Sequence, residues 1–269
     1  MKSTHYPFIQ NTFIDKIYFY LKFIIFVFIT IWLIVIKVIF GIILPKYSIH
    51  IPRFFHKILL WLINIKVKTE GNICIQNKGM IYVSNHLSYI DIPVLGSLLA
   101  AKFVAKLEVS KWPIIGNFAK IGNTIFIKRL KNDLLKEKNI IEQEIAIGGK
   151  VILFPEGTTS DGIRVLNFKS SLLSSVESQD SFIQPIVINY EGINGLPLNR
   201  GLKPVIAWYG DMDLKPHLLN LLKIFSITAR VCFLEPINSK DFKNRKNMTL
   251  SLQNVIGDCY SDKINDKKI

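Results

Sequence analysis

The stretch MIYVSNHLSYIDIPVLG, residues 80–96, sets the expectation for the fold. Its first five residues form a short apolar run typical of a buried β-strand, and the segment from Ile90 onward is suited to open a helix. His86 and Asp91 lie just beyond the point where this strand would end. Polar side chains that follow a buried strand are where α/β sheets build active sites, so this stretch predicts both a fold class and a site.

Strand-like and helix-like segments alternate along the rest of the chain from residue 66 onward. Strands are expected within residues 67–76, 102–106, 123–129, 149–154, 182–190 and 227–237. A helix is expected over residues 131–147. Alternation of this kind predicts an α/β domain with a mixed, mainly parallel sheet flanked by helices.

The composition indicates a membrane surface as the working environment. Hydrophobic residues make up 49% of the 269 residues, and Lys and Arg exceed Asp and Glu by 34 − 20 = 14. An apolar and basic chain favours contact with anionic phospholipids over contact with nucleic acid. The alternative is a compositional bias toward Ile, Lys and Asn, which would account for part of the charge.

The three cysteines are Cys74, Cys232 and Cys259. Their number is odd, their spacing is wide and no CxxC pair occurs, which argues against a disulfide framework or a zinc site. A reducing compartment is therefore expected.

Residues 17–44, IYFYLKFIIFVFITIWLIVIKVIFGIIL, form an apolar run that only Lys22 and Lys37 interrupt. At about 1.5 Å per helical residue the run is long enough to cross a hydrocarbon core of about 30 Å, with the two lysines snorkelling to the interfaces. A helix that lies in the interface is the alternative. Residues 52–65 predict a second, amphipathic helix against the bilayer or against the domain.

Three regions are therefore expected. Residues 1–65 would hold the membrane anchor and the amphipathic helix, residues 66–240 the α/β domain, and residues 241–269 a polar, basic C-terminal tail.

Several residues have the chemistry of a catalytic or binding site. Asp91 could orient the His86 imidazole and stabilise its protonated form, leaving the other ring nitrogen to accept a proton from a hydroxyl. A helix-capping or core histidine is the alternative, since the H-x4-D spacing alone is a weak signal.

Lys128 and Arg129 end the apolar segment GNTIFIKR, and a guanidinium group suits a phosphate, although a solvated strand end would look the same. In LFPEGTTSDG, residues 153–162, Gly157 and nearby hydroxyls could hold a polar headgroup, or the segment could be an ordinary turn. Pro185 inside an apolar strand suggests a sheet edge or a bend near a pocket.

Four blocks of sequence, in order, resemble the motifs of the lysophospholipid acyltransferase family, which includes the 1-acylglycerol-3-phosphate acyltransferases. They are NHLSYID, GNTIFIKR, FPEGTTS and IQPIVINY, and the resemblance spans about residues 66–210. The segment AWYGDMDLKPHLLNLL, residues 207–222, also resembles bacterial members that include lyso-ornithine lipid acyltransferases.

The resemblance implies a role for each matched position. His86 would be the general base and Asp91 its orienting partner. Arg129, with Lys128 beside it, would bind the phosphate of the acceptor. The remaining substrate-binding positions would be Glu156, Gly157, Thr158, Ser160 and Pro185.

The implied reaction moves an acyl chain from acyl-CoA or acyl carrier protein to the free hydroxyl of a lysophospholipid. The expected acceptor is 1-acylglycerol-3-phosphate, giving phosphatidic acid, with a lyso-ornithine lipid as the alternative. A thioester is already activated, so neither a metal nor another cofactor is expected. The expected location is the bacterial inner membrane, in contact with membrane phospholipids and with the catalytic domain on the cytoplasmic side.

Two other classes of function compete with this reading. A lipid hydrolase would need a serine nucleophile, but no G-x-S-x-G motif occurs. A non-enzymatic basic protein that binds a membrane or nucleic acid would give no role to the ordered His, Asp, Arg and Glu blocks.

Overall fold

The computed structural model describes residues 13–45, 47–74, 79–128, 134–177 and 181–265. Its strands are β1 (Ile65–Glu70), β2 (Met80–Ser84), β3 (Lys102–Lys106), β4 (Ile125–Ile127), β5 (Lys150–Leu153), β6 (Phe182–Ile193), β7 (Leu196–Pro197), β8 (Ile227–Phe233) and β9 (Ile237–Asn238). They form one sheet of order β1-β8-β6-β2-β5-β3-β4, and β7 and β9 pair with β6.

The sheet is mixed and mainly parallel, as predicted. Strand β2 pairs in parallel with both β5 and β6, and β3 pairs in parallel with β4 and β5. The β1–β8 pair is also parallel, whereas β7, β8 and β9 run antiparallel to β6. All five residues of β2 are buried, which explains its uninterrupted apolar character.

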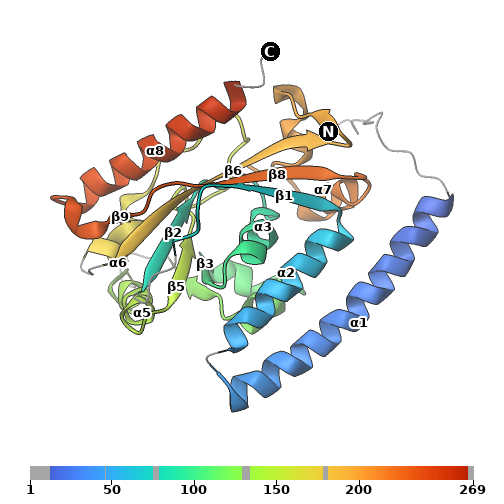
Figure 1. Ribbon diagram of the computed structural model, residues 1–269, viewed down its shortest axis with the longest axis horizontal. Helices are drawn as coiled ribbons and strands as arrows, with labels where there is room; N and C mark the ends of the chain where they lie inside the picture. Colours follow the sequence, from blue (N-terminus) through green and yellow to red (C-terminus); the bar gives the residue numbers. More distant parts are fainter. Residues whose placement is uncertain (1–12, 46, 75–78, 129–133, 178–180, 266–269) are drawn as a thin grey trace.

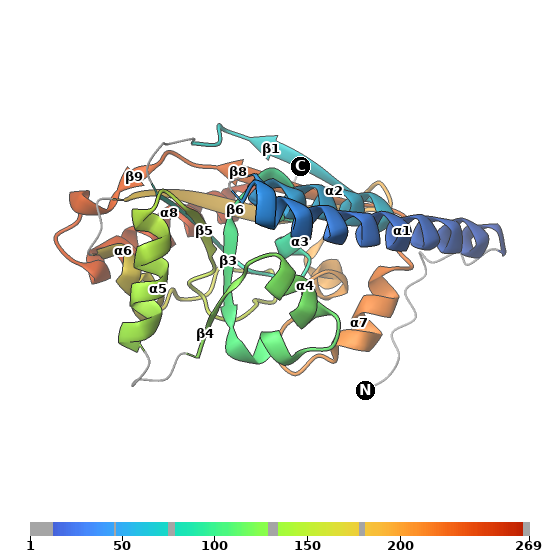
Figure 2. The same cartoon turned by 90° about the horizontal axis from the view of Figure 1, so that it is seen from below.

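Helices flank both faces of this sheet. They are α1 (Phe13–Ile43), α2 (Ile51–Leu62), α3 (Asp91–Leu98), α4 (Ile115–Ile121), α5 (Leu134–Ala146), α6 (Ser174–Glu177), α7 (Leu214–Leu221) and α8 (Arg245–Asn265). Short 3-10 helices are η1 (Ser48–His50), η2 (Leu107–Lys111), η3 (Ser170–Leu173), η4 (Arg200–Val205) and η5 (Ser239–Asp241). Helix α8 covers one face, and α2 and α3 lie on the other (Figures 1 and 2).

Helix α1 is the apolar helix that the sequence predicts. Residues Tyr20–Ile43 have a mean hydropathy of 3.0 and, by length and composition, could cross a membrane. Most of this segment is exposed, and the helix runs along the outside of the molecule beside α2 (Figure 1). The exposed apolar surface accords with association with lipid.

The two lysines of α1, which were expected to snorkel to the membrane interfaces, donate hydrogen bonds to backbone carbonyls of the protein. Lys22 Nζ donates to the Trp61 carbonyl at 3.4 Å, and Lys37 Nζ donates to the Ser48 carbonyl at 3.0 Å. Both lysines are buried against η1 and α2, because backbone carbonyls there offer hydrogen bonds that a hydrocarbon environment does not.

Helix α2 packs on the α/β domain through α3. The ring of His56 lies over Gly96, where an added Cβ would lie 2.3 Å from His56 Cδ2. Burial lowers the pKa of His56 to about 4, so the ring is neutral at physiological pH. The amphipathic helix was expected to lie against the bilayer or against the domain. In the structure, α2 contacts the domain on one side and α1 on the other.

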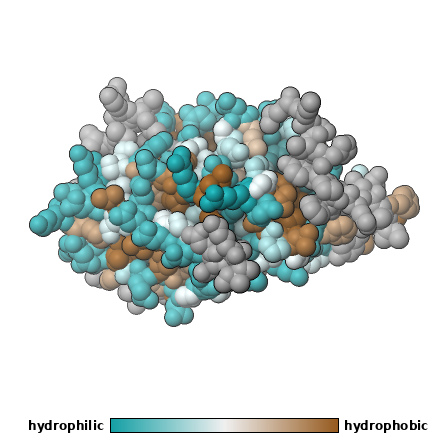
Figure 3. Space-filling model, turned by 90° about the horizontal axis from the view of Figure 1, so that it is seen from above, coloured by the Kyte–Doolittle hydropathy of each residue, from teal (hydrophilic) through white to brown (hydrophobic). Residues whose placement is uncertain are grey.

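The polar tail predicted for residues 241–269 is wrong for residues 245–265, which form α8. Its buried hydrophobic residues recur every four positions, which places them on one face of the helix: Met248, Leu252, Ile256 and Tyr260. Polar residues lie between these positions, so the average composition of the segment does not reveal its apolar face. Figure 3 views this side of the molecule and shows hydrophilic and hydrophobic residues mixed across it.

Pro185 does not lie in an edge strand, because β6 has neighbours on both sides. It pairs with Val83 of β2, and its carbonyl accepts from the Leu234 N–H at 3.0 Å. The β6–β8 ladder begins one residue later at Ile186, and the β6–β9 ladder ends at Ile183. The proline therefore occupies the gap between two ladders, where its missing N–H leaves no partner unsatisfied.

Candidate active site

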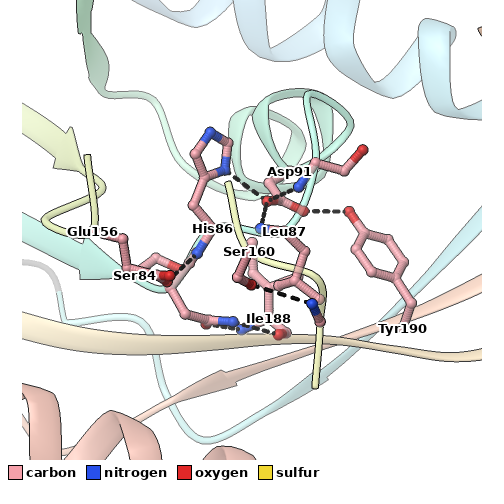
Figure 4. Close-up of polar contacts among 11 residues, drawn as sticks. Ser84, His86, Leu87, Asp91, Glu156, Ser160, Ile188 and Tyr190 are labelled. Atoms are coloured by element: carbon pink, nitrogen blue, oxygen red, sulfur yellow. Dashed lines mark hydrogen bonds and ion pairs between the residues drawn. The ribbon is translucent and has the colours of Figure 1, made fainter. Parts of the chain in front are cut away.

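The candidate site lies where β2 ends. Directly after Ser84, the side chain of Asn85 donates from Nδ2 to the Ile188 carbonyl at 2.9 Å, and Asn85 Oδ1 accepts from the Ile188 N–H at 2.8 Å (Figure 4). A carboxamide has one donor side and one acceptor side, so it continues the pairing with β6 after the backbone turns away. This anchor fixes the position from which His86 leaves the sheet.

His86 and Asp91 form a direct pair. His86 Nδ1 lies 2.8 Å from Asp91 Oδ2, and the same oxygen accepts the N–H groups of Leu87 at 2.7 Å and Ser88 at 2.9 Å (Figure 4). Asp91 is the first residue of α3 and is fully buried. Two backbone N–H groups and the helix N-terminus stabilise a carboxylate here, in spite of its burial.

Tyr190 of β6 contacts the other carboxylate oxygen. Its hydroxyl donates to Asp91 Oδ1 at 2.6 Å, and the ring is buried. Burial, together with the negative charge of Asp91, holds the pKa of Tyr190 well above its ordinary value, so the phenol stays protonated and remains a donor. Asp91 is therefore held by four hydrogen bonds.

The His86 ring is held by stacking as well as by Asp91. It lies parallel to the Phe154 ring, with 4.0 Å between centroids and 13° between planes. Its side chain keeps 16% of its surface exposed, and the second ring nitrogen points away from Asp91 (Figure 4). If Nδ1–H donates to Asp91, Nε2 is an acceptor open to a substrate hydroxyl.

Glu156 joins the two loops that carry the site. Its Oε1 accepts the His86 N–H at 2.8 Å, and its Oε2 accepts the Leu166 N–H at 3.0 Å. The residue is 1% exposed, and this burial raises the pKa of Glu156 to about 8, although both N–H bonds act in the opposite direction. Backbone groups thus engage both oxygens of a residue predicted to lie in the acceptor site.

The loop after β5 approaches His86 through its backbone. Gly157 has φ +72°, and its N–H donates to the Phe154 carbonyl at 3.1 Å, closing a tight turn. The Ser160 N–H donates to the His86 carbonyl at 2.8 Å, while Thr158 is exposed. The structure thus brings the FPEGTTS block beside the NHLSYID block, as the predicted site requires.

The remaining predicted residues lie farther along the sheet or outside the described residues. Lys128 is exposed at the end of β4, the last strand in the sheet order, and Arg129 lies outside the described residues. Pro185 is buried in β6 next to β2. Their contacts with substrate stay predictions.

Sequence reasoning missed three groups that support the site. Tyr190 holds Asp91, Asn85 anchors the loop, and Tyr260 of α8 donates to the Gly162 carbonyl at 2.6 Å. Lys203 of η4 lies beside Tyr260 and donates from Nζ to Asn189 Oδ1 at 2.9 Å. The four-residue spacing in α8 was the available signal for Tyr260.

Within the described part of the chain, no group of three or more His, Cys, Asp or Glu residues could hold a metal ion.

Comparison with known proteins identifies the class. The model of the acyltransferase family matches residues 64–189. A lyso-ornithine lipid O-acyltransferase of Rhizobium meliloti (strain 1021) is 35% identical over 222 residues, which cover 80% of this chain and 76% of that protein. Another, from Brucella abortus (strain 2308), is 33% identical over 214 residues, which cover 77% of this chain and 80% of that protein.

Two further matches are more distant. A 1-acyl-sn-glycerol-3-phosphate acyltransferase of Neisseria meningitidis is 26% identical over 168 residues, which cover 62% of this chain and 64% of that protein. The crystal structure of the 1-acyl-sn-glycerophosphate acyltransferase PlsC from Thermotoga maritima shares the fold, with a TM-score of 0.64 and 21% identity over 92% of this chain and 96% of that one.

A mixed sheet with a histidine and an aspartate at the end of β2, together with these matches, defines an acyltransferase of lipid metabolism. The chain belongs to the lysophospholipid acyltransferase family, so the resemblance drawn from the four motif blocks is confirmed.

Proposed function

We propose that this protein transfers an acyl chain from an acyl thioester to the free hydroxyl of a lyso-ornithine lipid. The observation that supports the reaction type is the His86 ring, which Asp91 holds through Nδ1 at 2.8 Å while the second nitrogen points away. The choice of acceptor rests on the relatives, because those at 33–35% identity are lyso-ornithine lipid O-acyltransferases.

In the proposed reaction, His86 Nε2 takes the proton of the acceptor hydroxyl as its oxygen attacks the thioester carbonyl. The tetrahedral intermediate then expels the thiolate, which receives the proton from the imidazolium. An ester bond forms and the thioester bond breaks, without a covalent enzyme intermediate. Asp91 stabilises the imidazolium, and its four hydrogen bonds keep the carboxylate from turning away from the ring.

The acyl donor in this proposal is acyl-CoA or acyl carrier protein. Both are anionic, and the net charge of +14 would attract either one to the enzyme. Since these donors are cytoplasmic, the catalytic domain would face the cytoplasm while α1 contacts the membrane.

The second candidate acceptor is 1-acylglycerol-3-phosphate. It is favoured by the GNTIFIKR segment, whose Lys128 and Arg129 suit a phosphate, and by the similarity to the Neisseria enzyme. The reaction and the roles of His86 and Asp91 would be the same for either acceptor.

A side-by-side assay tests the proposal. The full-length protein in phospholipid vesicles receives acyl-CoA or acyl carrier protein together with either acceptor, and mass spectrometry identifies the product. We expect ornithine lipid to form with a kcat/KM at least about tenfold above that for phosphatidic acid, a difference of about 1.4 kcal/mol.

The control is His86→Ala, which should lose about 10²–10⁴-fold in rate with an unchanged circular dichroism spectrum. Phosphatidic acid as the main product would select the second candidate. Release of free fatty acid without any acceptor would point to a hydrolase.

A further inference from the structure

The segment 85–87, which contains His86, is held by three other parts of the chain. The side chain of its first residue makes two hydrogen bonds to the backbone of Ile188 in β6. The His86 carbonyl accepts from the Ser160 N–H at 2.8 Å, and the carbonyl of the next residue accepts from the Trp208 N–H at 3.0 Å. The position of His86 therefore depends on how these three supports lie relative to one another.

Lys203 of η4 reaches two of the three supports through its side chain. Its Nζ donates to Asn189 Oδ1 at 2.9 Å, and Asn189 directly follows the β6 residue that holds the segment. Its Nζ also donates to the hydroxyl oxygen of Tyr260 at 3.5 Å, and that hydroxyl donates to the Gly162 carbonyl at 2.6 Å. The ammonium group thus connects β6 with the loop after β5.

Packing brings the same lysine against this loop. At Gly162, which has φ +74°, an added Cβ would lie 3.3 Å from Lys203 Cδ and 3.1 Å from Leu87 Cδ2. The Gly162 N–H donates to Ser160 Oγ at 3.3 Å, so the glycine is tied to the residue that holds the His86 carbonyl. The lysine stem, the loop and the segment 85–87 therefore pack together.

The third support depends on the backbone of Lys203. Its carbonyl accepts the N–H groups of Ile206 at 3.0 Å and Ala207 at 2.8 Å. These bonds close the turn that leads into Trp208, whose N–H holds the Leu87 carbonyl. Lys203 is therefore connected to all three supports.

The burial of this ammonium group argues for a role beyond packing. Lys203 is 4% exposed, Asn189 2% and Tyr260 1%. Taking an ammonium group out of water costs free energy, so an apolar side chain would suit a position that serves packing alone. A buried polar network, in contrast, fixes one arrangement of the groups that it joins.

We propose that Lys203 is a positioning residue that holds the three supports of the segment 85–87 in one arrangement and thereby sets the position of the His86 ring. It acts through Asn189, Tyr260 and its own carbonyl rather than by contact with substrate. The expected effect on rate rests on the proposed role of His86 as the base, whereas the expected effect on the supports does not.

Lys203→Met tests the proposal, because methionine keeps the length of the side chain and lacks the ammonium group. The matched control is Lys37→Met, which removes a second buried ammonium group, where α1 contacts η1. That group also makes two hydrogen bonds, to the Ser48 carbonyl at 3.0 Å and to Ser48 Oγ at 3.3 Å.

The full-length proteins are assayed in phospholipid vesicles with acyl-CoA and whichever of the two acceptors, lyso-ornithine lipid or 1-acylglycerol-3-phosphate, the wild type uses faster. We expect kcat of Lys203→Met to fall about tenfold or more, with the acceptor KM changed by less than about twofold. Lys37→Met should keep the wild-type kcat, since its ammonium group has no connection to the three supports.

Hydrogen exchange read by mass spectrometry tests the arrangement without relying on activity. In Lys203→Met, the peptides that contain Ser160 and Trp208 should exchange about tenfold faster than in the wild type, because their N–H groups lose the restraint on their partners. The peptide that contains β1 should keep the wild-type rate. Lys37→Met should leave all three peptides unchanged.

Tyr260→Phe removes only the hydroxyl that links Lys203 to Gly162, and it decides the question if Lys203→Met does not fold. We expect a similar loss of kcat, and the double variant should lose no more than the larger single loss, because both changes act through one network. Additive losses, a wild-type kcat in Lys203→Met, or unchanged exchange at Ser160 and Trp208 would overturn the proposal. A wild type that is inactive with both acceptors would contradict the proposed function, and the exchange rates would still decide the role of Lys203.

Discussion

The Tyr190 hydroxyl donates to Asp91 Oδ1 at 2.6 Å, the carboxylate oxygen that His86 does not use. Strand β6, which pairs with β2, thus sets the orientation of the proposed base, His86, through its partner Asp91. Tyr190→Phe keeps the ring and removes this bond. Hydrogen bonds to charged groups contribute about 1.5–3 kcal/mol, so we expect kcat to fall about tenfold or more, with little change in the acceptor KM.

The matched control is Tyr82→Phe, which removes a buried hydroxyl that donates to the Cys74 carbonyl at 3.1 Å, away from Asp91. Steady-state kinetics on both variants measure the difference. An equal loss of kcat in both would assign the effect to general loosening of the sheet.

Glu156→Gln should change how stability depends on pH. The pKa of Glu156 is raised to about 8 in the folded protein, above its unfolded value of 4.5. Between these values the folded state binds one more proton than the unfolded state, so the free energy of unfolding falls by about 1.4 kcal/mol per pH unit as the pH rises. The variant lacks this dependence.

The measurement is urea unfolding of wild type and Glu156→Gln at pH 5.5 and 7.5. We expect the wild type to lose stability relative to the variant as the pH rises, because unfolding of the wild type releases the proton that the buried Glu156 retains in the folded state. A constant difference between the two proteins would mean that Glu156 is already ionised in the folded state at pH 5.5.

Arg129→Lys and Asp91→Asn should change different kinetic parameters. Arg129 was assigned to the acceptor headgroup from the sequence, and lysine keeps the charge but loses the planar fork of donors. The acceptor KM should therefore rise with little change in kcat. Asp91→Asn removes the charge that stabilises the imidazolium, so kcat should fall by about 10²-fold or more. A selective rise in the donor KM for Arg129→Lys would move Arg129 to the donor site.

Two glycine substitutions form a matched pair for stability. At Gly96 an added Cβ would meet the buried His56 ring at 2.3 Å, whereas at Gly257 of α8 nothing lies within 4 Å. Both positions are helical, so alanine should gain up to about 1 kcal/mol from helix propensity at each. At Gly96 overpacking costs about 1–3 kcal/mol, so thermal unfolding should show a lower Tm for Gly96→Ala and an equal or higher Tm for Gly257→Ala.

Carbonate extraction should leave the protein in the membrane pellet, and detergent should release it. The reason is the exposed apolar surface of α1, which has a mean hydropathy of 3.0 over Tyr20–Ile43. Immunoblots of the supernatant and pellet measure the distribution. Complete release by carbonate would favour a helix that lies in the interface over one that is integral to the bilayer.

The sequence was sufficient for the sheet class, the anchor helix and the pairing of His86 with Asp91, because each depends on local patterns. A continuous apolar run predicts β2, and a five-residue spacing lets the carboxylate reach the ring once α3 begins at Asp91. The FPEGTTS block lies beside the histidine, since both follow the carboxyl ends of parallel neighbours, β2 and β5.

Features that depend on contacts between residues far apart in the sequence could not be predicted from local sequence patterns. Tyr190 lies 99 residues from Asp91, and Tyr260 lies 98 residues from Gly162, so their roles appear only when β6 and α8 are in place. Pro185 was expected at a sheet edge or at a bend near a pocket, because proline lacks an N–H. It lies not at an edge but in the central strand β6, between the residues that pair with β8 and those that pair with β9, where no strand needs its N–H.

The contact between α1 and α2 affects how a detergent-free form of the catalytic domain could be prepared. Phe55 of α2 lies between Phe26 of α1, at 5.8 Å, and Phe118 of α4, at 5.1 Å. Deleting the residues before Pro45 would remove the apolar surface of α1. It would also expose Phe55 of α2 to solvent, because Phe26 would no longer pack against it. A water-soluble version of this enzyme calls for polar replacements on the outer side of α2 at the same time as the deletion.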